Sequence, residues 1–331
     1  MYYFVRNEGF HIDRKPPEGV IYPEIALDAD HKVKLVDQRP PCASYKFPII
    51  PQYMPSLLKS NLQKAVRRQH SAVAFVTAKQ LLTQNPNELL RRLPIIMCED
   101  TLLHPPLFLE IVWLMAAVSK GYVLSAADCQ TIMDFVGAML LAPAMVNHAV
   151  GAPEAVLNYN DPLQFAFLLR IGYGGMKSDE AFMGRLVERV AIGELPRNLE
   201  FIHIDYESVG TFQIEHHLLR EAVDFHCFPS MISATGVRKP SIWFNRSAVN
   251  VRTYTGLGAT EGISTFVRAA TEFALTAKEL EAIEDFVDET IVRIRGHVKK
   301  KEPTQSRLTH FVRRGAASAA ALPQKMKPAD T

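Results

Sequence analysis

The segment from residue 56 to residue 192 is a succession of stretches in which apolar residues recur every three or four positions. Proline, serine, asparagine or aspartate separates these stretches, and such residues commonly start helices. The connections are short, which favours a compact multi-helix bundle or array. Helices are expected to start at residues 56 and 87 and to span 71–84, 107–120, 125–141, 161–171 and 178–192. Pro94 should kink or restart the helix that begins at residue 87.

The regions on either side differ from this helical domain. Residues 1–55 are rich in proline, and short runs at 2–6, 20–22 and 32–36 predict strands, so we expect a Pro-rich N-terminal arm that wraps the helices. Residues 193–298 mix both patterns and predict a smaller α+β region. Its expected elements are strands at 199–205, 241–244 and 249–254, a short helix at 215–223, and helices at 260–275 and 276–298. The predicted fold class is mainly α with a minor β component.

The composition is that of a folded chain outside the membrane. Apolar residues make up 48% and charged residues 22% of the chain, which excludes wholesale disorder. No run of 18 apolar residues occurs, and no secretory signal is evident at the start. The four cysteines are far apart and form no CxxC pair, which excludes a zinc finger and a disulfide scaffold. We therefore expect an intracellular protein with no membrane partner.

The charge is concentrated at one end of the chain. The total is +2, but residues 299–331 contain eight basic and two acidic residues, so this tail carries +6 and residues 1–298 carry −4. The tail has few large apolar residues and is expected to be disordered. This asymmetry predicts an interaction with a partner through the tail.

One short motif stands out in that tail. Gln305, Leu308 and Phe311 are spaced three residues apart and Val312 follows, with Lys299–Lys301 upstream. A 3₁₀ turn would place these side chains on one side as an apolar plug beside an amide. The segment resembles the peptide box by which replication and repair proteins bind the sliding clamp (proliferating cell nuclear antigen), although Val312 stands where that box has a second aromatic residue. The resemblance implies Gln305, Leu308, Phe311 and Val312 as the clamp-binding residues.

Two basic clusters flank the same motif. Lys299–Lys301 and Arg313-Arg314 are separated by a polar spacer, as in a bipartite nuclear-localisation signal. The two interpretations are compatible, and together they predict a nuclear protein if the source is eukaryotic. An inert basic tail is the alternative.

The helical region carries a second resemblance. Residues 61–103 include Leu-Gln-Lys-Ala-Val-Arg-Arg, an Ala-rich helix, Leu-Arg-Arg-Leu-Pro-Ile-Ile and a Glu-Asp pair. They resemble the C-terminal helical domain of clamp-loader-related ATPases of the maintenance-of-genome-stability type, in which such helices build an oligomeric collar. No GxxxxGK[ST] phosphate loop is present, so the ATP-binding motor of that family is missing. The alternative is a generic helical hairpin.

Candidate catalytic chemistry gathers between residues 215 and 227. Asp224 and His226 are the pair expected at an acid–base site, and on a helix His217 would share a face with Asp224 and complete a metal site with His226. A divalent metal is the cofactor such a site would take, although no cofactor is implied with certainty. Arg246 and Arg252 would suit an anionic ligand nearby. The alternative places these side chains in the core or on the surface without chemistry.

Four arginines predict contacts with nucleic acid. Arg67, Arg68, Arg91 and Arg92 form a basic cluster on the predicted hairpin that would suit the DNA backbone. No aromatic residues are interleaved with them, so a solvated helix face is the alternative. A glycine-rich turn at 256–262 lacks the GxGxxG spacing and the βαβ context of a dinucleotide site.

These observations favour a protein of DNA replication or repair that its C-terminal tail recruits to the sliding clamp, with DNA as a further partner. Two alternatives stay open. The first is a metal- or carboxylate-dependent hydrolase of a phosphate or nucleic-acid substrate, with Asp224 and His226 at its site. The second is a non-catalytic helical scaffold subunit. The sequence leaves the oligomeric state open.

Overall fold

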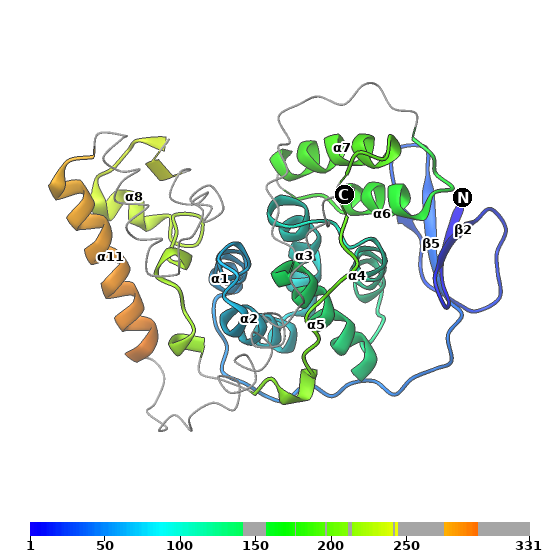
Figure 1. Ribbon diagram of the computed structural model, residues 1–331, viewed down its shortest axis with the longest axis horizontal. Helices are drawn as coiled ribbons and strands as arrows, with labels where there is room; N and C mark the ends of the chain where they lie inside the picture. The colour runs from blue at the N-terminus through cyan, green and yellow to red at the C-terminus, as the bar shows by residue number, and fades with distance from the viewer. Residues whose placement is uncertain are drawn as a thin grey trace, which may run out of the picture.

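The computed structural model describes residues 1–141, 157–175, 177–195, 197–210, 214–240, 242–243 and 275–296, without the side chain of residue 178. Helices dominate these residues, and one small sheet is formed near the N-terminus (Figure 1). The predicted fold class, mainly α with a minor β component, is confirmed. The strands are β1 (Tyr2–Arg6), β2 (Phe10–Asp13), β3 (Val20–Ile21), β4 (Ile25–Ala26) and β5 (Lys32–Asp37). The α-helices are α1 (Pro55–Arg67), α2 (Ser71–Gln84), α3 (Pro86–Asp100), α4 (Pro105–Val118), α5 (Ala126–Leu141), α6 (Pro162–Gly172), α7 (Lys177–Ala191), α8 (Ser230–Thr235) and α11 (Ala277–Gly296).

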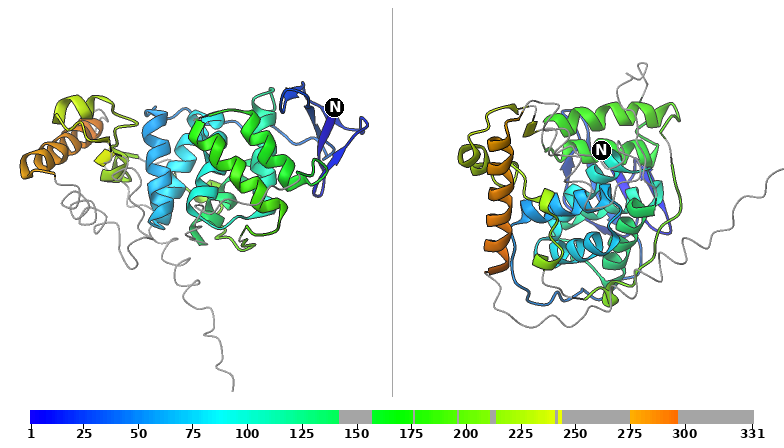
Figure 2. Two further views of the ribbon diagram at one scale, coloured as in Figure 1. Left: turned by 90° about the horizontal axis from the view of Figure 1, so that it is seen from above. Right: turned by 60° about the vertical axis from the view of Figure 1, so that its left-hand side comes forward.

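The molecule is elongated, with the sheet at one end and α11 at the other. Figure 2 shows α1 to α7 between these two ends. None of the described helices combines the length and the apolar character that a membrane crossing requires.

The first 37 residues form the sheet, in the order β2-β1-β5-β3, with β4 paired to the other end of β5. β1 and β5 are parallel, and the remaining pairs are antiparallel. Phe4 of β1 and Leu35 of β5 are paired in register, and both belong to the main hydrophobic core. The strands predicted at 2–6, 20–22 and 32–36 are confirmed.

The proline-rich segment between β5 and α1 lies in an extended conformation along the helices (Figure 1). Side-chain amides of α2 hold it: Gln84 exchanges hydrogen bonds with the backbone of Tyr53, and Gln80 donates to the carbonyl of Pro51. Because prolines lack an N–H, such a segment cannot extend the sheet. Contacts with helix side chains therefore fix its course.

Helices α1 to α7 share one hydrophobic core, in which α4 packs against α3, α5 and α6. The predicted range 71–84 is that of α2. The helix does not restart at Pro94, because α3 continues through this residue from Pro86 to Asp100. A proline removes only its own N–H from the helical ladder, and burial of Pro94 between neighbouring helices offsets that loss.

The segment 199–205 was predicted as a strand and is not one. It is extended, but its backbone bonds to helix side chains rather than to another strand. Gln130 of α5 donates to the carbonyl of Ile204 at 2.8 Å and accepts from the backbone N–H of Tyr206 at 2.8 Å. An alternating pattern predicts an extended backbone but not the partner that satisfies it.

The next turn is held in the same way. Nζ of Lys79 is buried and donates to the carbonyls of Tyr206 and Val209 at 2.7 and 2.5 Å, and burial lowers the pKa of this lysine. Gly137 of α5 lets the segment pass, since a Cβ there would collide with the carbonyl of Ile202.

Residues 214–240 and 242–243 together with α11 form a smaller unit with its own hydrophobic cluster, to which Leu57 of α1 also belongs. The helix predicted at 215–223 is wrong: two 3₁₀ turns, η2 (Ile214–His216) and η3 (Arg220–Ala222), stand in its place. Leu219 between them is extended and donates its N–H to Asn61 of α1 at 2.9 Å, which interrupts a helical ladder.

The strand predicted at 241–244 is also wrong in its described part, where Ile242 and Trp243 are helical. The predicted start of the last helix is confirmed. The Thr276 hydroxyl accepts from the N–H of Glu279, and the Glu279 carboxylate accepts from the N–H of Thr276, the reciprocal pair of a capping box. The strand predicted at 249–254 and nearly all of the helix predicted at 260–275 lie outside the described residues.

Candidate functional site

Asp224 and His226 lie in a tight turn that follows η3. The backbone N–H of His226 donates to Oδ1 of Asp224 at 3.0 Å, and Nδ1 of the ring lies 2.9 Å from the same oxygen. The Asp224 side chain is 1% exposed, whereas that of His226 is 44% exposed. An ionised carboxylate can only accept, so Nδ1 carries the ring hydrogen and Nε2 is the basic nitrogen of the neutral imidazole.

Lys64 of α1 completes this cluster. Its Nζ donates to Oδ2 of Asp224 at 3.1 Å and to the hydroxyl of Ser60 at 2.9 Å. Ser60 and Lys64 are four residues apart, so they share one face of the helix. The polar cluster Ser60–Lys64–Asp224–His226 therefore joins α1 to a turn 160 residues later in the chain.

The environment of Asp224 favours its charged form. Burial alone raises the pKa of Asp224, but the hydrogen bonds from His226 and the charge of Lys64 outweigh burial and hold this pKa well below its ordinary value. Burial lowers the pKa of Lys64, and the nearby carboxylate opposes that effect. At neutral pH, Asp224 is an ionised acceptor that orients the ring of His226.

Cys227 follows directly but faces another partner. Its Sγ donates to the carbonyl of Ser56 at 3.2 Å, and burial raises the pKa of the thiol. A buried thiol with a raised pKa forms little thiolate, so Cys227 is a poor nucleophile.

The predicted metal site at His217, Asp224 and His226 is not supported. Nowhere in the described parts of the chain do three His, Cys, Asp or Glu side chains gather in a way that could hold a metal ion. The prediction placed His217 and Asp224 on one helix face, and that helix is replaced by 3₁₀ turns. Burial is the main cause that lowers the pKa of His217, and the neighbouring His216 and His70 lower it further.

Three of the four arginines expected to contact DNA are paired with carboxylates instead. Nε of Arg67 donates to Asp100 at 2.8 Å, and Arg92 lies 3.4 Å from Asp179 of α7. The third, Arg68, is buried and lies 3.0 Å from Glu221.

The fourth of these arginines, Arg91, is engaged by the backbone. It donates to the carbonyl of Tyr173 at 3.3 Å. The carboxylates beside the other three arginines come from α3, α7 and η3, which no local sequence pattern indicates.

A second histidine–aspartate pair lies elsewhere. Nδ1 of His203 lies 2.9 Å from Oδ1 of Asp134 on α5, and the His203 side chain is 64% exposed. Asp205 caps the 3₁₀ turn η1 (Tyr206–Ser208) by accepting from the N–H of Glu207. Neither His203 nor Asp205 joins the Ser60–Lys64–Asp224–His226 cluster.

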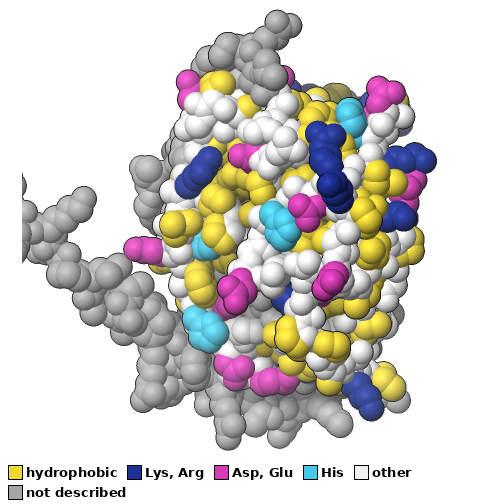
Figure 3. Space-filling model, turned by 90° about the vertical axis from the view of Figure 1, so that its right-hand side faces the viewer, with side chains coloured by type: hydrophobic (Ala, Val, Ile, Leu, Met, Phe, Trp, Pro, Cys, Tyr) yellow, Lys and Arg dark blue, Asp and Glu magenta, His cyan; other side chains and the backbone are white. Residues whose placement is uncertain are grey.

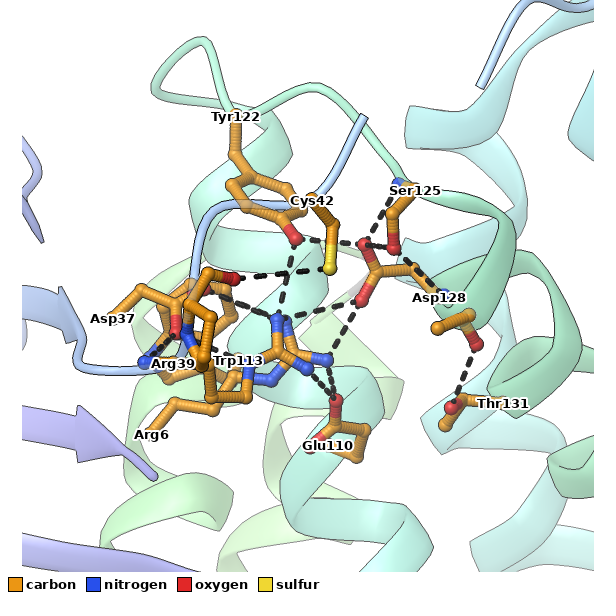
Figure 4. A network of polar contacts seen from close by, with 12 residues as sticks. Arg6, Asp37, Arg39, Cys42, Glu110, Trp113, Tyr122, Ser125, Asp128 and Thr131 are labelled. Atoms are coloured by element: carbon orange, nitrogen blue, oxygen red, sulfur yellow. Dashed lines mark hydrogen bonds and ion pairs between the residues drawn. The ribbon is translucent and has the colours of Figure 1, made fainter. Parts of the chain in front are cut away.

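A second polar network was not predicted from the sequence. Figure 4 shows Arg6, at the end of β1, among the carboxylates of Asp128, Glu110 and Asp37. Arg6 donates to Asp128 at 2.7 Å, lies 4.0 Å from Asp37, and pairs with Glu110 of α4. The Arg6 and Asp128 side chains are only 1% and 0% exposed.

Asp128 is the centre of this network. It also accepts from the hydroxyl of Tyr122 at 2.7 Å and from the N–H and hydroxyl of Ser125, both at 2.8 Å. Burial would raise the pKa of Asp128, but Arg6 and these hydrogen bonds lower it. The network ties the sheet to α4 and α5. Its one local sequence signal was the helix predicted to begin at residue 125.

The surface at the sheet end carries mixed charge. Figure 3 shows Lys and Arg side chains interspersed with Asp, Glu and apolar side chains over this face. Its described residues form no extended field of one sign.

The remaining predicted site residues lie outside the described residues. These are Arg246, Arg252, Gln305, Leu308, Phe311 and Val312. Comparison of the chain with models of protein families, with curated proteins and with solved structures gave no match.

Proposed function

We propose that this chain acts in DNA replication or repair and is recruited to the sliding clamp by its C-terminal tail. The observation that carries the proposal is the spacing of Gln305, Leu308 and Phe311 within a basic tail. The leucine and the phenylalanine supply an apolar plug, and the glutamine supplies an amide for a polar pocket beside it. By residue frequencies, such a match occurs by chance in about 1–2% of tails this long.

The charges of the body support recruitment through a protein partner. Arg67, Arg68 and Arg92 are neutralised by carboxylates, so they do not offer a cationic face to the DNA backbone. The tail keeps its charge of +6, which would steer it toward an acidic protein surface. Its two basic clusters also suit a nuclear-localisation signal, and we include a nuclear location in this proposal.

The test is calorimetry of a peptide spanning residues 295–314 against a purified sliding clamp. We expect saturable binding, because two apolar side chains and one amide enter preformed pockets. A Gln305→Ala/Phe311→Ala peptide of the same length and charge is the control and should give no heat. Absence of heat from the native peptide, or equal binding by both, would contradict the proposal.

A second function is favoured by one specific contact. Asp224 and His226, proposed from sequence as the site of a hydrolase, are within hydrogen-bond distance, with Lys64 and Ser60 beside them. We propose that this cluster is the acid–base centre of a carboxylate-dependent hydrolase acting on a phosphate or nucleic-acid substrate. His226 would accept a proton from water at Nε2, and Asp224 would hold the ring and stabilise the imidazolium that forms. The clamp proposal does not depend on this chemistry.

Substitution of His226 tests the second function. We expect His226→Gln to lower the hydrolysis of bis(p-nitrophenyl) phosphate by about 100-fold or more, because general-base catalysis contributes at least that much. His203→Gln is the matched control, since His203 is also exposed and paired with an aspartate. The hydrolase proposal would be contradicted by equal rates for the wild type and both variants. It would also be contradicted if the wild type hydrolysed neither this ester nor a single-stranded oligonucleotide.

A further inference from the structure

A cavity of about 450 Å³ lies where the two hydrophobic clusters of the molecule meet. Three segments line it: the end of the extended arm with the first turn of α1, the turn that follows Asp224, and the last turns of α11. Tyr53 packs against the main core, whereas Leu57, Phe228 and Ile294 belong to the smaller cluster or pack against it. The cavity is thus built jointly by the helical body and the smaller unit.

Among the residues that the structure describes, the lining is mostly apolar with one cation. Tyr53, Met54, Leu57, Phe228 and Ile294 supply its walls, and Arg293 is its charged member. The volume falls within the range of small-molecule sites, which combine apolar walls with a few placed polar groups. At about 30 Å³ per heavy atom, it has room for a ligand of about 15 such atoms.

The polar group of Tyr53 already has a partner. Its hydroxyl donates to the buried carboxylate of Glu215 at 2.5 Å, so the ring contributes apolar surface to the wall. Arg293 has an exposed side chain. It donates a long hydrogen bond of 3.4 Å to the hydroxyl of Thr290, which is an uncharged acceptor. The described lining therefore matches a ligand that is apolar over most of its length and anionic at one end.

We propose that this cavity binds a small amphiphilic carboxylate, with an apolar chain of about ten carbons between the two units and its carboxylate on Arg293. The charge favours this occupant over the chain's own tail. Residues 299–331 carry +6, and they would approach a cavity that is already lined by the cation Arg293. This site does not depend on either proposed function.

Calorimetry of the full chain with sodium decanoate, below its micelle concentration, tests the site. We expect one decanoate per chain. We expect Arg293→Met to weaken decanoate by about tenfold or more, because a charge-assisted hydrogen bond is lost, and to leave decanol unchanged. Lys278→Met is the matched control, since Lys278 is an exposed cation on the same helix that does not line the cavity, and it should bind decanoate like the wild type.

Blocking the cavity gives an independent result. Ile294→Trp fills the space and should abolish binding of decanoate and decanol alike, while circular dichroism verifies the fold. Equal affinity for decanoate in wild type and Arg293→Met, or no decanoate binding by the wild type, would overturn the proposal. Binding that appears only after deletion of residues 297–331 would also overturn it, because the tail would then be the natural occupant.

Discussion

Replacing Arg6 with methionine is expected to lower the free energy of unfolding by about 3–5 kcal/mol, the usual effect of removing one partner of a buried ion pair. Asp128 has no exposed surface and would keep Arg39, at 3.6 Å, as its nearest cation. Glu110 of α4 would lose its short contact with Arg6 as well. Methionine fills a similar volume, so lost charge rather than a cavity causes the effect. Urea unfolding at pH 7 measures it.

Arg39→Met is the control for this prediction. Its guanidinium reaches the same carboxylates but is 31% exposed, so we expect a loss of about 1 kcal/mol or less. If both variants lost the same free energy of unfolding, the burial of Arg6 would not increase the contribution of its ion pairs to stability.

The same network predicts a dependence on pH. The folded-state pKa of Asp128 is lower than its unfolded value of about 3.9, so its ionisation stabilises the protein above that value and the stabilisation is lost as pH falls through the folded pKa. In the Arg6→Met variant the charge of Arg6 no longer opposes the effect of burial, so the folded-state pKa of Asp128 is higher than in the wild type. The difference in stability between wild type and variant should therefore shrink as the pH falls below about 4 and through the folded pKa of Asp128.

The second large effect is expected at the contact between the two units. Asp224→Ala would leave Lys64 buried without its carboxylate and should also cost about 3–5 kcal/mol in urea unfolding at pH 7. The double variant Lys64→Met/Asp224→Asn removes both charges and nearly keeps the volume, so it should recover most of the loss.

An exposed pair provides the matched control. Asp288 pairs with Arg220 but is 59% exposed, and Asp288→Ala should cost less than about 1 kcal/mol. If Asp224→Ala were as mild as Asp288→Ala, the contact between Lys64 and Asp224 would contribute nothing to stability. If the double variant were less stable than Asp224→Ala alone, unpaired charge would not explain the loss.

The sequence predicted those parts of the fold that depend on local signals. The end of α2 before Asn85-Pro86 and the capping pair of Thr276 and Glu279 are fixed by residues within one turn of each other. The Asp224–His226 contact is local too, since the two residues are neighbours in one turn.

The remaining features depend on partners far away in the sequence. No pattern near Lys64 indicates that Asp224 will neutralise it, and no pattern near Arg67 indicates Asp100. The basic cluster predicted on the hairpin therefore became a set of ion pairs. The segment 215–223 has helix-forming residues, but hydrogen bonds with Asn61 hold it in another conformation. Tertiary contacts overrode local propensity in both cases.

The two units of the molecule meet at the features that matter most for chemistry. The Ser60–Lys64–Asp224–His226 cluster and the cavity beside Arg293 each take residues from α1 or the preceding arm and from the smaller unit. Ligand binding in the cavity would therefore also stabilise the contact between the units. The tail that we propose as the clamp ligand follows α11 directly, at the end of the smaller unit.

Recruitment through the tail can be tested by titrating the whole chain into a purified sliding clamp. We expect saturable binding by the wild type and none by the Gln305→Ala/Phe311→Ala variant, with the same thermal unfolding midpoint for both chains because the described core is unchanged. Equal binding by the two chains, or no binding by the wild type, would contradict recruitment through the tail.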